Sequence, residues 1–206
     1  MFTLSDADLQ RRILGCGDGP ASFNAEASAA SAQIVSCDPL YAFDRTQIQA
    51  RIDATYANVI EETRRNQSEF LWDDIPSVEA LAEIRMQAMR TFLEDYEDGR
   101  ATGRYVAAAL PALPFTNGSF DLALCSHYLF LYTAHLTEDF HVAAVQAMCR
   151  VANEARIFPL LALGSEPSRH VEPVRRRLAA GMFHVTIERV PYEFQKGGNQ
   201  MMRVRR

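Results

Sequence analysis

The sequence predicts an α/β fold in which a mostly parallel sheet is covered by helices on both faces. Two observations favour this fold class. Apolar runs bounded by turn residues alternate with segments of helical spacing along the 206 residues. Near the start, Ile13 to Asp38 has the pattern of a strand, a glycine-rich turn, a helix and a second strand that ends in an acid. Such a unit is typical of proteins that bind a nucleoside-containing ligand.

The turn is Gly15-Cys16-Gly17-Asp18-Gly19. Its alternate glycines remove the Cβ where the backbone bends sharply and where a ligand approaches the main chain. Pro20 suits the first position of a helix, because its missing N–H would have no partner there, and we expect this helix to run to Ala30. Asp38 ends the second strand about 20 residues beyond the turn, the distance at which such units place a ribose-binding carboxylate.

The other elements follow from the same two patterns. Strands are expected where short apolar runs are bounded by turn residues, and helices where apolar residues recur at intervals of three and four. The predicted strands are Arg12 to Leu14, Gln33 to Cys37, Tyr105 to Ala109, Phe120 to Cys125, Ala155 to Ala162, Met182 to Val190 and Gln200 to Val204. The later predicted helices are Thr137 to Val151 and Pro173 to Ala180, the second ended by Gly181.

Residues 42–103 exceed the length of one crossover helix and predict a helical insertion between the second and third strands. Its helices are expected at Thr46 to Asn66 and at Ser77 to Gly99, with Ser77 as N-cap and Gly99 as the end. Because the chain begins close to its first strand, we expect the insertion to roof the site. A lengthened core or a homodimer face is an equal alternative. The apolar positions with heptad-like spacing are Ile48, Ile52, Tyr56, Val59, Ile60, Leu81, Ile84, Ala88, Phe92 and Tyr96, with Trp72 between the helices.

A family resemblance rests on two motifs in the right order. The G-x-G-x-G turn differs from the dinucleotide fingerprint and lacks the lysine of a P-loop. Further on, Leu113-Pro114-Phe115 precedes the run Gly118 to Cys125. With these motifs the chain resembles the class I S-adenosylmethionine (SAM)-dependent methyltransferases. The resemblance implies a three-layer, Rossmann-like fold with a seven-stranded sheet, an antiparallel C-terminal hairpin and a single domain over residues 1–206.

The resemblance also implies where SAM binds. The turn, with Gly15, Cys16, Gly17, Asp18 and Gly19, matches the segment that approaches the methionine and ribose, and Asp38 matches the acid on the ribose hydroxyls. Two acids usual in the family are replaced by Ile13 and Ala109. Adenine is therefore expected on main-chain atoms of Ala109 and Leu110 and against Leu40 beside Pro39, and Asp18 is a candidate to compensate for Ile13.

Ser126, His127 and Tyr128 follow the predicted fourth strand, at the sheet edge where methyl acceptors are expected. Ser126 is assigned to the cofactor, and His127 and Tyr128 are the candidate catalytic residues. His127 would serve as base for an acceptor that loses a proton. The alternative is a histidine that only packs or hydrogen-bonds at a strand end. His135 and His141 lack the spacing of a zinc pair, so no metal is predicted.

Composition narrows the class of protein. Hydrophobic residues make up 48% and charged residues 23%, and no apolar run approaches the ~20 residues of a membrane span. The start lacks the pattern of a signal peptide, and the four cysteines form no C-x-x-C pair, which favours reduced thiols in the cytoplasm. The net charge of −5 disfavours nucleic acid, although Arg175 to Arg177 and Arg203 to Arg206 are locally basic.

These observations favour a SAM-dependent methyltransferase that acts on a small molecule and releases S-adenosylhomocysteine (SAH). The two missing acids leave open a non-catalytic protein of the same fold that binds a nucleoside ligand or a protein partner. RNA methylation is a third hypothesis, drawn from the basic runs alone.

Overall fold

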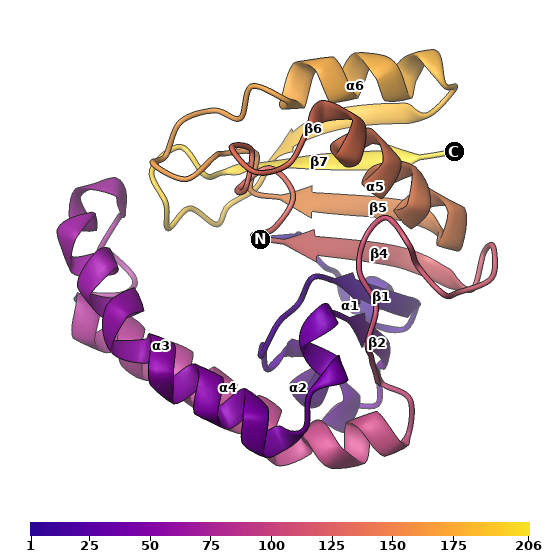
Figure 1. The fold of residues 1–206 in the computed structure, drawn as a ribbon. Coiled ribbons are helices and arrows are strands. Elements are labelled where there is room, and N and C mark those ends of the chain that lie inside the picture. Colours follow the sequence, from indigo (N-terminus) through magenta and orange to yellow (C-terminus); the bar gives the residue numbers. More distant parts are fainter.

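The computed structural model describes residues 1–206, which form one seven-stranded sheet with helices on both sides (Figure 1). The strand order is β3-β2-β1-β4-β5-β7-β6. All neighbours are parallel except β7, which is antiparallel to both β5 and β6. The strands are β1 (Arg12–Cys16), β2 (Gln33–Cys37), β3 (Tyr105–Val106), β4 (Phe120–Ser126), β5 (Ala152–Phe158), β6 (His184–Arg189) and β7 (Gln200–Arg205). The predicted fold class, with its antiparallel hairpin and its insertion, is confirmed.

The helices differ in which side of the sheet they cover. They are α1 (Asp6–Leu9), α2 (Phe23–Ala29), α3 (Arg45–Arg65), α4 (Val78–Ala101), α5 (Glu138–Val151) and α6 (Val171–Ala180), with 3₁₀ turns η1 (Pro39–Ala42) and η2 (Gln67–Glu69). Helix α5 buries Val145 and Met148 against strand residues such as Ala123 and Ile157. Side chains alternate along a strand, so Ile13, the neighbour of Leu14, belongs to the opposite face, where Phe23 of α2 packs.

Several predicted boundaries are wrong, each for a local reason. Helix α2 does not begin at Pro20: Gly19 is left-handed at φ +57°, and the chain continues as a turn until Ser22 precedes the helix. Helix α4 continues past Gly99 to Ala101, because that glycine admits the ring of Tyr105, which a Cβ would overlap.

Two strand predictions also shift. Strand β3 ends at Val106, because its ladder with β2 holds only two residue pairs. Strand β5 runs from Ala152 to Phe158, where Pro159 follows and brings no N–H to a ladder. The predicted cap of α4 at Ser77 is confirmed, because its side chain accepts a hydrogen bond from the Ala80 N–H.

Helices α3 and α4 form an antiparallel pair, hereafter the arm, which extends beyond the sheet edge in Figure 1. The base of the arm is held by an apolar cluster that includes Tyr41, Ile52, Phe92, Tyr96 and Tyr105. The Tyr96 hydroxyl donates to the backbone oxygens of Tyr41 and Phe43, at 3.1 and 2.8 Å. This half of the arm is therefore part of the core. Of the heptad-like apolar positions, Tyr56, Val59 and Ile84 lie further out and are exposed.

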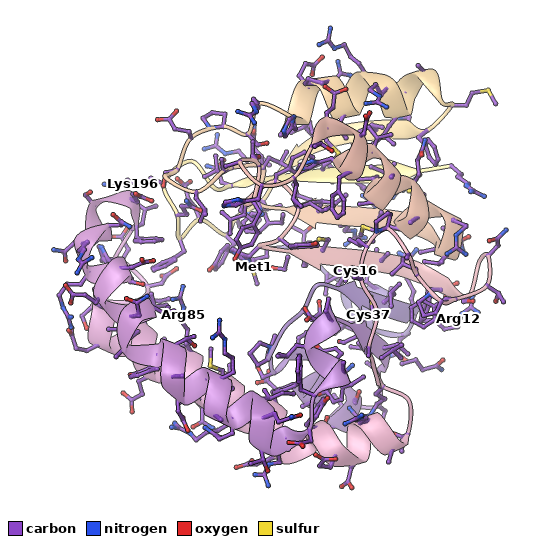
Figure 2. The ribbon with its side chains drawn as sticks, viewed as in Figure 1. Met1, Arg12, Cys16, Cys37, Arg85 and Lys196 are labelled. Atoms are coloured by element: carbon purple, nitrogen blue, oxygen red, sulfur yellow. The ribbon has the colours of Figure 1, made fainter.

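The far end of the arm contacts the chain between β6 and β7, and we call this the tip contact (residues 69–72 with 194–196). The Leu71 N–H donates to the Phe194 oxygen, and the Lys196 N–H donates to the Glu69 oxygen, both at 2.8 Å. The ring of Phe194 stacks on Phe70 at 5.0 Å and meets Trp72 edge-on at 5.5 Å. Figure 2 shows Lys196 beside the arm's far end. The arm is thus anchored at both ends.

A charged cluster occupies the sheet face beside α1. Glu154 of β5 is 4% exposed and accepts hydrogen bonds from Arg156, Arg203 and Arg205 at 2.6 to 3.0 Å. Although burial alone would raise it, hydrogen bonds from Arg203, Arg156 and Arg205 lower the pKa of Glu154 to about 2. Four charged side chains therefore take the place of apolar packing on this part of the sheet.

Arg156 carries this cluster to the start of the chain. It is 3% exposed and donates to the Phe2 oxygen at 2.9 Å and to the Asp8 carboxylate at 3.2 Å. Because a buried guanidinium needs its partners, these bonds hold the segment Met1 to Leu4 across the edge of the sheet.

We expect Glu154→Gln to lower the free energy of unfolding by about 3 kcal/mol at neutral pH, because Arg156 stays buried with less counter-charge. The folded state lowers the pKa of Glu154 from 4.5 to about 2, so its contribution is fully present above pH 4.5 and is lost as pH falls through about 2. Urea unfolding at pH 7 and at pH 3 measures this effect.

The control is Glu172→Gln on α6, whose contacts with Arg175 and Arg176 are exposed. It should leave the midpoint nearly unchanged. Equal midpoints for the two variants would contradict a stabilising role for Glu154.

Candidate functional site

The carboxyl ends of β1, β2 and β4 meet at one edge of the sheet, and two cavities open there on either side of the glycine turn. The first, the Asp38 cavity, has a volume of about 360 Å³ and is lined by Gly17, Asp38, Pro39, Ala108, Ala109, Leu110, His127, Tyr128 and Tyr132. The second, the Asp18 cavity, has about 590 Å³ and is lined by Met1, Phe2, Thr3, Leu4, Gly15, Asp18, Ala21, Phe23, Leu124, Ser126 and His127. His127 belongs to both, so it marks their junction.

The turn between the cavities requires two of its glycines. Gly17 has φ +71°, and a Cβ there would lie 2.8 Å from Cδ1 of Tyr128. A Cβ on Gly15 would overlap the Asp18 carboxylate. Each glycine therefore admits a neighbouring side chain, and Gly17 also allows the bend. The predicted Cys16 differs: it is fully buried in the core, where its backbone pairs with Cys37.

Asp38 holds the turn in shape. Its Oδ2 accepts the Gly19 N–H at 2.9 Å, and its Oδ1 accepts the Leu40 N–H at 2.8 Å. Gly19 in turn accepts a hydrogen bond at its oxygen from the Tyr41 hydroxyl at 2.8 Å. A carboxylate has about four acceptor positions, so Asp38 keeps capacity for two further donors from the cavity it lines.

Asp18 has an unusual environment for an acid. The residue is half-buried, but its carboxyl group turns inward against Gly15, and its Oδ2 accepts the Ser36 hydroxyl at 2.6 Å. No arginine or lysine pairs with it. Burial is the main cause that raises the pKa of Asp18 to about 7, and the nearby Asp38 charge adds to it. The Asp18 cavity thus contains a carboxyl group that lacks a positive partner.

The Ser36 hydroxyl links Asp18 to the base of the arm. It accepts a hydrogen bond from the Asn24 amide at 3.1 Å, and the Asn24 oxygen accepts one from Arg104 at 2.7 Å. Arg104 is also paired with the Asp95 carboxylate of α4 at 2.6 Å. A continuous set of hydrogen bonds therefore positions the Asp18 carboxyl group.

His127 follows β4 in a strained conformation. Its φ of +52° lies in the left-handed region, and its N–H donates to the Phe158 oxygen at 2.7 Å. Nδ1 is 2.8 Å from the Ser126 hydroxyl, whereas Nε2 has no partner in the protein. One side of the residue is exposed at the cleft, while the atoms around its ring partly withdraw the imidazole from water. Withdrawal from bulk water, then the charges of Arg85 and the terminal ammonium, lower the pKa of His127 to about 4. The ring is therefore neutral at pH 7, and its Nε2 is free to accept a hydrogen bond.

Tyr128 has a different setting. Its ring lies against Gly17 and forms a wall of the Asp38 cavity, 6.2 Å from the ring of Tyr132. Ala109, Leu110 and Pro39 line the same cavity, which brings three predicted adenine contacts together. Leu40 does not line it; its side chain borders the neighbouring cavity beneath the arm.

Two contributors escaped the sequence analysis. The segment Met1 to Leu4 lines the Asp18 cavity, although cover was expected from the insertion alone. Arg85 lines the cavity beneath the arm and acts on His127 through its charge. The sequence does contain a signal for Arg85: it lies four residues after the buried Leu81 and seven before the buried Phe92, on the apolar stripe of α4.

No group of three or more His, Cys, Asp or Glu side chains is placed to hold a metal ion.

The arm has one of the roles predicted for the insertion, because its base belongs to the core. Its outer part borders a separate cavity, and no residue of the arm lines the Asp38 or the Asp18 cavity, so a roof over the site stays a prediction. Whether it moves as a lid, and whether its exposed residues meet a second copy, stay predictions. None of the helices has the length and apolarity to cross a membrane.

Comparison with solved structures identifies the fold. The magnesium protoporphyrin IX methyltransferase of Synechocystis PCC 6803, solved with bound SAM, aligns with a TM-score of 0.50 and 11% identity over 98% of this chain and 73% of that one. The same enzyme with bound SAH aligns with a TM-score of 0.53 and 13% identity, over 98% and 76%. At these identities the likeness concerns the fold.

Comparison of sequences identifies a relative. No protein-family profile matches the chain. The uncharacterized protein MJ0045 of Methanocaldococcus jannaschii is 30% identical over 208 aligned positions, which cover 100% of this chain and 90% of the relative. The chain therefore belongs to the same family as MJ0045, and its fold is that of the class I SAM-dependent methyltransferases.

Proposed function

We propose that the protein is a SAM-dependent methyltransferase that acts on a small molecule and releases SAH. The observation that carries the proposal is the pair of cavities that join at His127, each with a carboxyl group, on either side of a glycine that admits no side chain. SAM has a ribose with two hydroxyl groups and an amino-acid end with an ammonium group. Its elongated shape fits two joined cavities, and its ribose hydroxyl groups and its ammonium group can each donate to one of the two carboxyl groups.

The residues present fit the cofactor. Asp38 accepts the ribose hydroxyl groups with the two acceptor positions that the turn leaves free. Adenine lies between Pro39 and Ala109, in a part of the Asp38 cavity that carries no acid. Asp18 takes the methionine ammonium and thereby supplies the charge that Ile13, buried in β1, lacks. Ser126 lines the same cavity beside it.

His127 is proposed as the proton acceptor. When bound, SAM supplies an electrophilic methyl group. The protein's tasks are to align the acceptor with that group and to remove a proton where the acceptor atom carries one. His127 stands at the junction of the cavities with a neutral ring, and its bond to Ser126 sets the ring orientation. Tyr128 contributes by fixing the wall beside Gly17.

Most of the arginines that suggested RNA are paired within the chain. Arg175 pairs with Glu172, and Arg177 with Glu138 and Asp139. Arg203 and Arg205 pair with Glu154. These arginines are engaged within the chain, which supports a small-molecule acceptor over a polyanion.

The first test concerns Asp38. We expect Asp38→Ala to weaken SAH binding about tenfold or more, because two charge-assisted hydrogen bonds to the ribose are lost. Asp38→Asn keeps one acceptor oxygen and should bind with intermediate affinity. Isothermal titration calorimetry gives all three affinities, and mass spectrometry of the protein as purified shows whether SAM or SAH is retained.

The matched control is Asp44→Ala, which also removes a capping carboxylate: Asp44 caps α3 by accepting the Gln47 N–H at 2.8 Å, but it lines neither cavity. It should bind SAH with wild-type affinity. A folded Asp38→Ala protein with unchanged affinity would remove the ribose assignment. Binding without methyl transfer to any acceptor would favour the non-catalytic alternative.

The second test uses pH. The pKa of Asp18 is raised to about 7, so below pH 7 the group is mostly protonated and must release its proton to pair with the ammonium. Affinity for SAH should therefore rise up to about tenfold per pH unit between pH 5 and 7. Asp18→Asn should bind more weakly at pH 7 and lose this dependence. Calorimetry in two buffers of different ionisation enthalpy measures the released proton, and an unchanged slope in the variant would contradict the assignment.

A further inference from the structure

A third cavity lies beneath the arm, and we call it the arm cavity. It has a volume of about 230 Å³ and lies between α3, α4, Pro20 after the glycine turn and Leu40 of η1. Its walls are mainly apolar, with Ile48, Ile52, Met86 and Met89 among them. The charged residues on its walls are Arg51 and Arg85. The cavity therefore offers apolar surface and positive charge without a carboxylate to neutralise it.

Arg85 differs from the paired arginines of the chain. Arg64, Arg104, Arg156 and Arg177, for example, each contact a carboxylate within 3.2 Å. Arg85 forms neither an ion pair nor a hydrogen bond with the protein, although it is half-buried. Burial lowers the pKa of its guanidinium, which Tyr192 partly offsets. A guanidinium withdrawn from water and left without a partner costs free energy unless a ligand supplies the anion.

The direction of Arg85 connects the arm cavity to the proposed methyl-transfer site. Figure 2 shows its side chain reaching from α4 into the space between the arm and the sheet edge, on the side of Met1. After burial, its charge is the next cause that lowers the pKa of His127, and it opposes the burial that raises the pKa of Tyr192. The rings of His127 and Tyr192 both pack against Phe158. Arg85 thus lies between the apolar walls of the arm and the residues after β4.

We propose that the methyl acceptor is an amphiphilic anion whose acidic group is bound by Arg85 and whose apolar body lies against the arm cavity. This assignment rests on the proposed function, because it names the substrate class of the same site. Guanidinium binds carboxylate and phosphate groups through the same forked hydrogen bonds, so either acid meets the requirement.

The cofactor's own carboxylate does not satisfy Arg85 in this arrangement. The amino-acid end of SAM is assigned to the Asp18 cavity, and Arg85 does not line that cavity. Arg85 and His127 instead face the acceptor from two sides. The anion is held at the arm and the reacting atom is held at β4.

The experiment measures binding of simple probes to the full chain saturated with SAH. Octanoate carries both an acidic group and an apolar body, octyl phosphate exchanges the acid, 1-octanol lacks the charge, and acetate lacks the body. We expect octanoate or octyl phosphate to bind most tightly. Arg85→Gln should weaken that binding at least tenfold while leaving 1-octanol unchanged, and Arg85→Lys should restore part of it. Whichever of octanoate and octyl phosphate binds more tightly shows whether the site prefers a carboxylate or a phosphate.

The control is Arg90→Gln on the same helix, since Arg90 contacts Gln87 and does not line the arm cavity. It should bind the probes as the wild type does. The proposal would be overturned if 1-octanol and octanoate bound equally well, or if Arg85→Gln left the affinity for octanoate and octyl phosphate unchanged. SAH affinity, measured on the same samples, separates the two hypotheses. SAH binding without anion binding would reject only the proposed acceptor class. Anion binding that depends on Arg85, without SAH binding, would reject SAM as the cofactor.

Discussion

The two hydrogen bonds from backbone N–H groups to Asp38 are the constraint on which the site depends. They join the end of the glycine turn to the start of η1, so that Gly17 and the chain after β2 keep a fixed separation. The Asp38 cavity lies between these segments. Ser36, two residues earlier, orients Asp18 through its hydroxyl group on the other side of the turn. One strand end therefore shapes both cavities, and a change in its register would displace them together.

The sequence predicted those features that are encoded by local chemistry. The glycine turn, Asp38, the caps at Ser77 and Gly181 and the final hairpin each need only a few adjacent residues. It failed where distant contacts decide. Gly99 resembles a helix end until Tyr105 is seen to pack on it. Ile84 has the spacing of an apolar stripe, yet the structure exposes it and turns Arg85 to the cavity. The pairing of Asp18 with Ser36 likewise depends on the packing of strands, which periodicity does not report.

The two faces of the sheet differ in the side chains that cover them, a difference that the amino-acid composition does not show. One face is a continuous apolar core beneath α5 and α6, whereas the other changes from apolar residues on β1 and β4 to the cluster around Glu154 on β5 and β7. Arg156 extends that cluster to the Phe2 oxygen and to Asp8, so the segment that lines the Asp18 cavity is held by this hydrogen bond and by the packing of Phe2 and Leu4. The position of this wall of the Asp18 cavity therefore depends on the hydrogen bonds of Arg156.

The double anchoring of the arm constrains how its sequence can vary in length. Helix α3 has 21 residues and α4 has 24, and both must span from the aromatic cluster around Tyr96 to the tip contact at Phe194. At a rise of about 1.5 Å per residue, a deletion in one helix shortens only one side of this span. Insertions and deletions among relatives should therefore occur in pairs, in both helices at once and in whole turns, or be matched by a change in the connection between β6 and β7.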